Sequence, residues 1–114
     1  MSQDFDGGGA TLTRPTRRRK RQLRRLPPYN VVLLNDDDHS MEFVVEVLTK
    51  VFSYTLERCV QLMLVAHTSG RSIIWTGSKE VAELKVEQIR SFHEKKQGAD
   101  LGPLGCDIEP APGS

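Results

Sequence analysis

A short apolar run that ends abruptly in polar residues places the strongest constraint on the fold of this chain. Residues 30–35 read Asn-Val-Val-Leu-Leu-Asn, which is typical of a buried strand because the run is short, apolar and partly β-branched. Asp36 and Asp37 follow directly, so an amide and two carboxylates stand where the backbone leaves the sheet. A helix that opens at Met41 can then set apolar side chains beside them. The pattern predicts hydrogen-bond acceptors next to an apolar pocket.

Such a pocket suits a cation that carries an apolar group. A peptide's own N-terminus is a ligand of this kind, because its α-ammonium group has three donors and lies next to the first side chain. Asn35 offers an amide oxygen, Asp36 a carboxylate, and neutral His67 one ring nitrogen. However, an Asn-Asp pair after a strand is more often a turn, and a lone histidine is more often structural or solvated. The residues alone leave both interpretations open.

Three helices are predicted from apolar periodicity, and each begins after a hydroxyl residue that can cap it. The first runs to about residue 51, the second ends at Gly70, and the third is expected to end near Gly98. Further strands are predicted at 72–76 and 104–109. The predicted N-caps are Ser40, Thr55 and Ser78.

The element order β-α-α-β-α-β predicts an α+β fold. We expect a small three-stranded, mostly antiparallel sheet packed against three helices, because each amphipathic helix must bury its apolar stripe on the sheet. Residues 27–110 are predicted to form this core, and 111–114 a flexible C-terminus. At 114 residues the chain has room for one such domain and an extension.

The formal net charge of +1 hides a strong asymmetry. Residues 1–26 contain eight of the 16 basic residues and two of the 15 acidic ones, which leaves eight basic and thirteen acidic residues in the rest of the chain. Self-repulsion and few apolar side chains predict that 1–26 is a disordered basic extension, joined to the core through Pro27-Pro28.

Several classes of protein are disfavoured by the sequence. No apolar run approaches the roughly 18 residues that suggest a membrane span, and no apolar segment of the signal-peptide type follows the N-terminal charges. Cys59 and Cys106 lack the short spacing of a metal site, so we expect reduced thiols, no metal or other cofactor, and a cytoplasmic protein.

The chain resembles the bacterial ClpS adaptors in four motifs that occur in the same order and at the same spacing. The resemblance covers roughly residues 27–109 and implies the fold derived above. The motifs are Asn35-Asp36-Asp37, Met41-Glu42-Phe43-Val44, Gln61-Leu62-Met63-Leu64 with His67, and Glu80-Val81-Ala82-Glu83 with Lys85.

What the resemblance implies is a non-enzymatic adaptor. ClpS adaptors bind substrates with a bulky hydrophobic N-terminal residue, an N-degron, and deliver them to a Clp AAA+ unfoldase of the ClpA or ClpC type and its peptidase. In this chain Asn35, Asp36 and His67 would bind the terminal amine, with Asp37 and His39 as nearby polar groups. The side-chain pocket would be lined by Met41, Val44, Met63, Ala66 and Leu104, with Met41 acting as a gate against β-branched residues.

Delivery would involve two other parts of the chain. By resemblance, Glu80 and Lys85 contact the N-terminal domain of the unfoldase, and the N-terminal extension takes part in handing over the substrate. From the residues alone, these charges read as a solvated helix face, because exposed charge pairs contribute at most about 1 kcal/mol. We expect the adaptor to be a monomer.

Three substitutions depart from the usual family pattern. Asp38 stands where an aromatic residue is often found. His39 stands where a small hydroxyl residue is common, which puts one peptide contact in doubt. Ala66 stands where valine is often found, so it can widen one wall of the pocket and alter the preference among Leu, Phe, Tyr and Trp.

The main alternative is a small nucleic-acid- or ribosome-binding protein that acts through its arginine-rich extension. Seven cationic side chains within residues 17–25 would bind phosphates with strong salt dependence. Against this alternative, the core is acidic and has no aromatic RNA-binding motif. An enzyme is the least favoured class, because the sequence has no nucleophile motif, phosphate-binding glycine loop or set of metal ligands.

Overall fold

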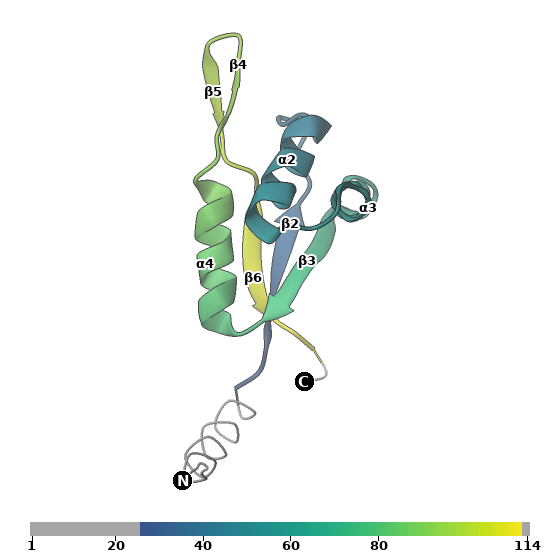
Figure 1. Ribbon diagram of the computed structural model, residues 1–114, viewed down its shortest axis with the longest axis vertical. Coiled ribbons are helices and arrows are strands. Elements are labelled where there is room, and N and C mark those ends of the chain that lie inside the picture. The colour runs from purple at the N-terminus through teal and green to yellow at the C-terminus, as the bar shows by residue number, and fades with distance from the viewer. Residues whose placement is uncertain (1–25, 113–114) are drawn as a thin grey trace, which may run out of the picture.

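The structure is a computed structural model, and it describes residues 26–112 (Figure 1). The predicted extension 1–26 lies outside the described residues except for Leu26, and so do the last two residues of the predicted C-terminal segment. The predicted boundaries of these two segments, and the disorder of the extension, therefore stay predictions.

A three-stranded antiparallel sheet forms the centre of the fold, with β2 paired to β3 on one side and to β6 on the other. A separate two-stranded hairpin is formed by β4 and β5. The predicted α+β fold with three helices and an antiparallel sheet is confirmed. In chain order the elements are β2 (Tyr29–Leu34), α2 (Met41–Phe52), α3 (Leu56–Ser69), β3 (Arg71–Gly77), α4 (Lys79–Arg90), β4 (Glu94–Lys96), β5 (Ala99–Gly102) and β6 (Cys106–Pro110).

The helices begin where the sequence predicted. Ser40, Thr55 and Ser78 each precede a helix, and each side chain accepts a hydrogen bond from the backbone N–H three residues later. These bonds satisfy donors that the first turn of a helix leaves without partners. Gly70 ends α3 with a φ of 91°, a left-handed conformation that glycine adopts without steric cost.

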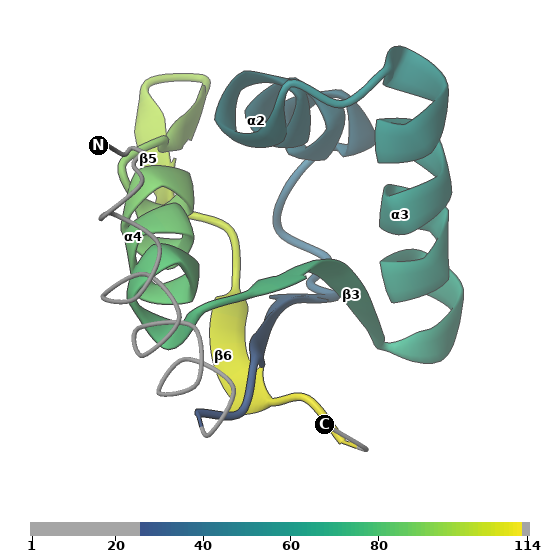
Figure 2. The ribbon, with the colours of Figure 1, turned by 60° about the horizontal axis from the view of Figure 1, so that its bottom comes forward.

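The three helices lie on one side of the sheet, with α2 between α4 and α3 (Figures 1 and 2). Each helix contributes its apolar stripe to a common core, which the inward-facing residues of the strands complete. This packing fixes α2 and α3 above the end of β2. The buried core residues are Val31, Leu33, Val47, Leu48, Val51, Cys59, Ala66, Ile74, Ala82, Val86, Ile89, Leu104 and Cys106.

The predicted end of the third helix was wrong. α4 stops at Arg90, eight residues before Gly98, and the β4–β5 hairpin follows. Gln97 and Gly98 have φ values of 53° and 82°, so both central residues of the hairpin turn are left-handed. A turn of this geometry matches the twist of the two strands that it joins. The hairpin rises beside the N-terminal end of α2 (Figure 1).

Both cysteines are free and buried. Among the helices of residues 26–112, none is long and apolar enough to cross a membrane.

Candidate functional site

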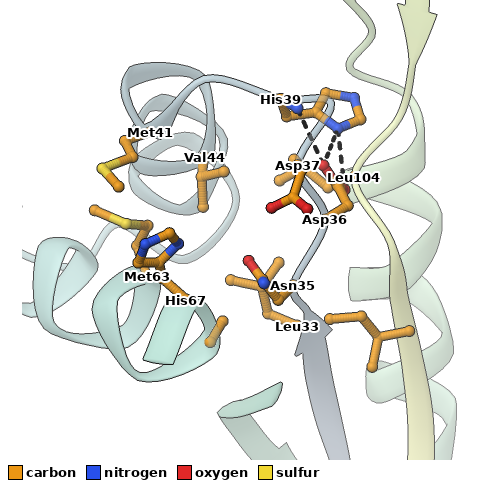
Figure 3. Close-up of a pocket in the computed structure, with 12 residues that line it drawn as sticks. Leu33, Asn35, Asp36, Asp37, His39, Met41, Val44, Met63, His67 and Leu104 are labelled. Carbon is orange, nitrogen blue, oxygen red and sulfur yellow. Dashed lines mark hydrogen bonds and ion pairs between the residues drawn. The ribbon is translucent and has the colours of Figure 1, made fainter. Parts of the chain in front are cut away.

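A cavity of about 170 Å³ lies between the end of β2, the start of α2 and the second half of α3 (Figure 3). It brings together every residue that the sequence placed at the amine site or in the apolar pocket. Its lining residues are Leu33, Leu34, Asn35, Asp36, Asp37, His39, Met41, Val44, Met63, Ala66, His67 and Leu104.

Backbone hydrogen bonds fix the point at which the chain leaves the sheet. The N–H of Leu34 donates to the carbonyl of Gly105 at 2.9 Å, and the N–H of Asn35 donates to the carbonyl of Gly70 at 3.0 Å. The end of β2 is therefore held between the segment before β6 and the C-terminal cap of α3. This anchoring sets residues 35–39, which we call the acceptor loop, at the mouth of the cavity.

The apolar wall of the cavity is an extension of the core. Met63, Ala66 and Leu104 are 7%, 3% and 3% exposed, so their positions are set by packing against the rest of the molecule. Val44 is half-buried and packs on the same core. Met41 differs from the others, because it is 45% exposed and stands at the rim.

The polar residues come from two sides of the opening, because Asn35, Asp36 and Asp37 belong to the acceptor loop and His67 lies on α3 (Figure 3). Asn35, Asp37 and His67 are all exposed. Figure 3 shows the Asn35 amide on the side of the acceptor loop that faces α3, the helix that carries His67. Within residues 26–112, no hydrogen bond or ion pair engages the Asp37 carboxylate.

Asp36 is already engaged by its own loop. One carboxylate oxygen accepts the backbone N–H groups of Asp38 at 3.1 Å and His39 at 3.0 Å. Nδ1 of His39 lies 2.9 Å and 3.0 Å from the two carboxylate oxygens. Asp36 therefore organises the acceptor loop, while its second oxygen keeps capacity for a further donor.

The other ring nitrogen of His39 reaches across to the hairpin. Nε2 lies 2.9 Å from the carbonyl oxygen of Gly102, the last residue of β5. No local pattern predicts this contact, because it joins residues 63 positions apart. His39 was predicted only as a nearby polar group.

These contacts move two pKa values in opposite directions. Burial alone would raise the pKa of Asp36, but the His39 ring and the two backbone N–H groups hold it below its usual value. Burial alone would lower the pKa of His39, but the Gly102 carbonyl, the Asp36 carboxylate and the charge of Glu94 together raise it. The pair is thus stabilised in its charged form.

A second link joins the start of α2 to the hairpin. Glu94 of β4 accepts the backbone N–H of Ser40 at 3.0 Å and its hydroxyl at 2.7 Å. The same hydroxyl caps α2 by accepting from the N–H of Phe43 at 3.2 Å. The hairpin, which was not predicted from the sequence, therefore holds the acceptor loop at His39 through Gly102 and the N-cap of α2 at Ser40 through Glu94.

Glu80 and Lys85 lie on α4, away from the cavity. Glu80 is exposed in the first turn of the helix. Lys85 is half-buried and donates to the carbonyl of Val51 at 3.1 Å, with its ammonium group 5.4 Å from the ring centre of Phe52. Lys85 thus also holds the C-terminal end of α2, where cations are favoured by the helix dipole.

Comparison with known proteins identifies the family. The family described as "ATP-dependent Clp protease adaptor protein ClpS" matches residues 24–107. This chain belongs to the ClpS family. The matched region contains the whole cavity and leaves five of the seven cationic residues of 17–25 outside it, so the nucleic-acid alternative is not favoured.

Individual ClpS proteins are similar over most of their length. The ATP-dependent Clp protease adapter protein ClpS of Pectobacterium carotovorum is 45% identical over 94 residues, which cover 82% of this chain and 85% of that protein. The ClpS of Xanthomonas campestris is 47% identical over 85 residues, covering 75% and 76%. Both support family membership independently of the structure.

A solved ClpS structure has the same fold. Agrobacterium tumefaciens ClpS2 bound to L-phenylalaninamide superposes with a TM-score of 0.66 at 29% identity, covering 75% of this chain and 98% of that one. Its ligand has a free α-amino group next to an aromatic side chain.

Proposed function

We propose that this protein is an N-degron adaptor, which binds the free N-terminus of a substrate that begins with a bulky apolar residue. The observation that carries the proposal is a single cavity with an apolar wall and a rim of acceptors. Pockets for drug-sized ligands measure roughly 300–1,000 Å³, so a cavity of about 170 Å³ suits one amino-acid side chain. The phenylalaninamide ligand of the Agrobacterium protein has the same two chemical parts.

The α-ammonium group would bind at the rim. Asn35 and neutral His67 supply one acceptor each, and Asp36 supplies its second carboxylate oxygen, which is contacted only by Nδ1 of His39 and so has capacity for a further donor. Asp37 adds a second carboxylate at the same opening. Hydrogen bonds to charged groups are worth about 1.5–3 kcal/mol each, so acetylation of the peptide amine should remove most of the affinity.

The first side chain would enter the apolar part of the cavity. Met63 and Met41 can adapt to aromatic and aliphatic groups, because methionine is flexible and polarizable. Met41 stands at the rim, where a branch at the β-carbon of the ligand would meet it. Ala66 leaves more room in the wall than a larger residue would, which alters the preference among Leu, Phe, Tyr and Trp.

Binding is tested most directly with peptides that differ only in their first residue. Fluorescence anisotropy should give tight binding for peptides that begin with Phe, Leu, Tyr or Trp and weak binding for those that begin with Ile, Val, Lys or Asp. An N-acetylated Phe peptide serves as the control for the amine. Equal affinity across the series would contradict the proposal.

Delivery to a Clp AAA+ unfoldase would use other surfaces. We place the unfoldase contact on α4, through Glu80 and Lys85, and substrate hand-over in residues 1–26. Removal of residues 1–26 should leave peptide affinity nearly unchanged and strongly slow degradation of an N-degron substrate by the unfoldase and its peptidase.

The charge of the extension can be separated from its length. Replacing Arg17, Arg18, Arg19, Lys20 and Arg21 with serine should slow degradation less than the truncation does. If the serine variant slows degradation as strongly as the truncation at physiological salt, the charge itself is recognised, and the extension binds an anionic partner.

A further inference from the structure

His39 has surroundings that a neutral histidine cannot satisfy. Its side chain is 5% exposed, so water does not compensate for a missing partner. Nδ1 faces the Asp36 carboxylate and Nε2 faces the Gly102 carbonyl, and both of these groups only accept hydrogen bonds. A neutral imidazole has one donor and one acceptor, whereas the imidazolium has two donors. The geometry therefore fits the imidazolium alone.

The groups around the ring agree with a positive charge there. Asp36 faces it from the acceptor loop and Glu94 from β4, and both are acidic. From α2, the Phe43 ring stacks on the imidazole with ring centres 5.5 Å apart and contributes no charge. From β5, the contact is the uncharged Gly102 carbonyl.

From this arrangement we infer that His39 is a positioning residue for peptide binding: as an imidazolium it holds Asp36 in place and ties the acceptor loop to the β4–β5 hairpin. The inference rests on the proposed function, since Asp36 matters to the ligand only if the cavity binds a peptide N-terminus. It adds a regulatory property, namely that affinity decreases when His39 loses a proton as the pH rises.

When the His39 ring loses a proton, one of its two hydrogen bonds, to Asp36 or to Gly102, is broken. If the neutral ring keeps Nδ1–H toward Asp36, a lone pair of Nε2 faces the Gly102 oxygen and the hairpin contact is lost. If it keeps Nε2–H, the Asp36 contact is lost instead. Either way, the link that runs from the Gly102 carbonyl through the His39 ring to the Asp36 carboxylate is interrupted.

The test compares affinities for a Phe-initiated peptide across pH 6–9 in the full chain, His39→Gln and His93→Gln. His93 is the matched control, because it pairs with the Asp100 carboxylate at 3.1 Å in an exposed part of the molecule. The peptide amine titrates near pH 8 in all three proteins, so the affinity of each variant is divided by that of the full-length wild type at each pH.

We expect His39→Gln to bind about tenfold more weakly at pH 6.5, which is the loss expected for one charge-assisted hydrogen bond. This deficit should shrink toward pH 9, while His93→Gln matches the wild type throughout. A deficit that is constant with pH, or one shared by His93→Gln, would overturn the inference.

Nitrogen-15 spectra of the wild type provide a readout that needs no variant. At pH 6.5 both ring nitrogens of His39 should carry protons, and the amide signals of residues 99–102 should shift in step with the His39 titration at higher pH. A neutral His39 ring at pH 6.5 would refute the positioning role even if His39→Gln does not fold. If the wild type binds no peptide, the proposed function fails, and the spectra still decide the state of the ring.

Discussion

The two sides of the cavity are held by different forces. The apolar wall is part of the core, and Ala66 and Leu104 are positioned there by close packing of helices on the sheet. The acceptor loop stacks His39 on the Phe43 ring and is otherwise held by charge-assisted hydrogen bonds, which the His39 ring donates to the Asp36 carboxylate and to the Gly102 carbonyl. The shape of the pocket thus depends on the same packing as global stability, whereas the geometry of the acceptors depends on a local network.

This difference means that the two sides can be disrupted separately. A change in the wall alters which side chains fit, and a large change there also destabilises the fold. A change in the acceptor loop weakens binding of every N-terminus, because each ligand carries the same ammonium group. Selectivity and overall affinity should therefore respond to different substitutions.

The largest expected effect comes from removing the acceptors. Asn35→Ala combined with Asp36→Ala should weaken binding of a Phe-initiated peptide by roughly 100-fold or more, because the desolvated ammonium group loses two charge-assisted hydrogen bonds. Anisotropy measures this loss. The control is Gln88→Ala combined with Glu83→Ala, which also removes one amide and one carboxylate, but from exposed positions on α4. This control should leave the peptide affinity unchanged. Unchanged affinity in the first variant would show that the strand end is only a turn.

A substitution at the rim of the wall should change selectivity instead. Met41→Ala should improve binding of Ile- and Val-initiated peptides by about tenfold, which is the lower end of the discrimination that one methylene group provides in an apolar pocket. Since Met41 is 45% exposed, the free energy of unfolding should change little. Leu56→Ala, at an apolar side chain that is 66% exposed, is the control. If Met41→Ala still binds Ile-initiated peptides weakly, another residue excludes β-branched side chains.

The sequence predicted the wall better than it predicted the loop. Helix starts were located by Ser40, Thr55 and Ser78, because N-capping is local and leaves a signal within three residues. Met63 was placed by helical periodicity and the family motif, and Ala66 by the motif alone. A pocket next to the acceptors followed from the predicted strand and helix, whereas the residues that line it with Asn35 came from the family resemblance.

The support of the acceptor loop could not be predicted, because it comes from residues distant in sequence. The hairpin that carries Gly102 has mostly charged and polar residues and no β-branched ones, so its strands lack the usual signal. The Gln97-Gly98 pair was the available signal, since glycine after a polar residue favours a left-handed turn. Apolar spacing that continues through Ile89 and Phe92 favoured a longer helix instead.

The Asp36–His39 pair should make stability depend on pH in a defined direction. The pKa of Asp36 is lowered, so its contribution is present above about pH 4 and is lost as the pH falls through its lowered value. The pKa of His39 is raised, so its contribution is present below about pH 6.5 and is lost as the pH rises through its raised value.

His39→Gln should therefore reduce the free energy of unfolding by roughly 1–2 kcal/mol between about pH 4 and 6.5, and by less at pH 9. Urea unfolding at several pH values measures the difference. His93→Gln, whose side chain is 44% exposed, should show a much smaller change. A deficit that grew with rising pH would mean that the neutral ring is the stabilising form.

The smallest effect is expected at Gly102, whose carbonyl contacts the His39 ring. Gly102 has a φ of 77° and open space where a Cβ atom would lie, so Gly102→Ala suffers only the backbone cost of a left-handed conformation, about 1–2 kcal/mol. Gly98→Ala is a close match, because its φ is 82° and it too has open space. Both variants should lose similar stability in urea unfolding.

Only Gly102→Ala should also weaken peptide binding, and by less than His39→Gln does. The reason is that the carbonyl of Gly102 contacts His39, so relaxation of the strained backbone at residue 102 shifts that contact. If both variants weaken binding equally, the hairpin supports the acceptor loop through its overall stability and the contact between Gly102 and His39 has no special role.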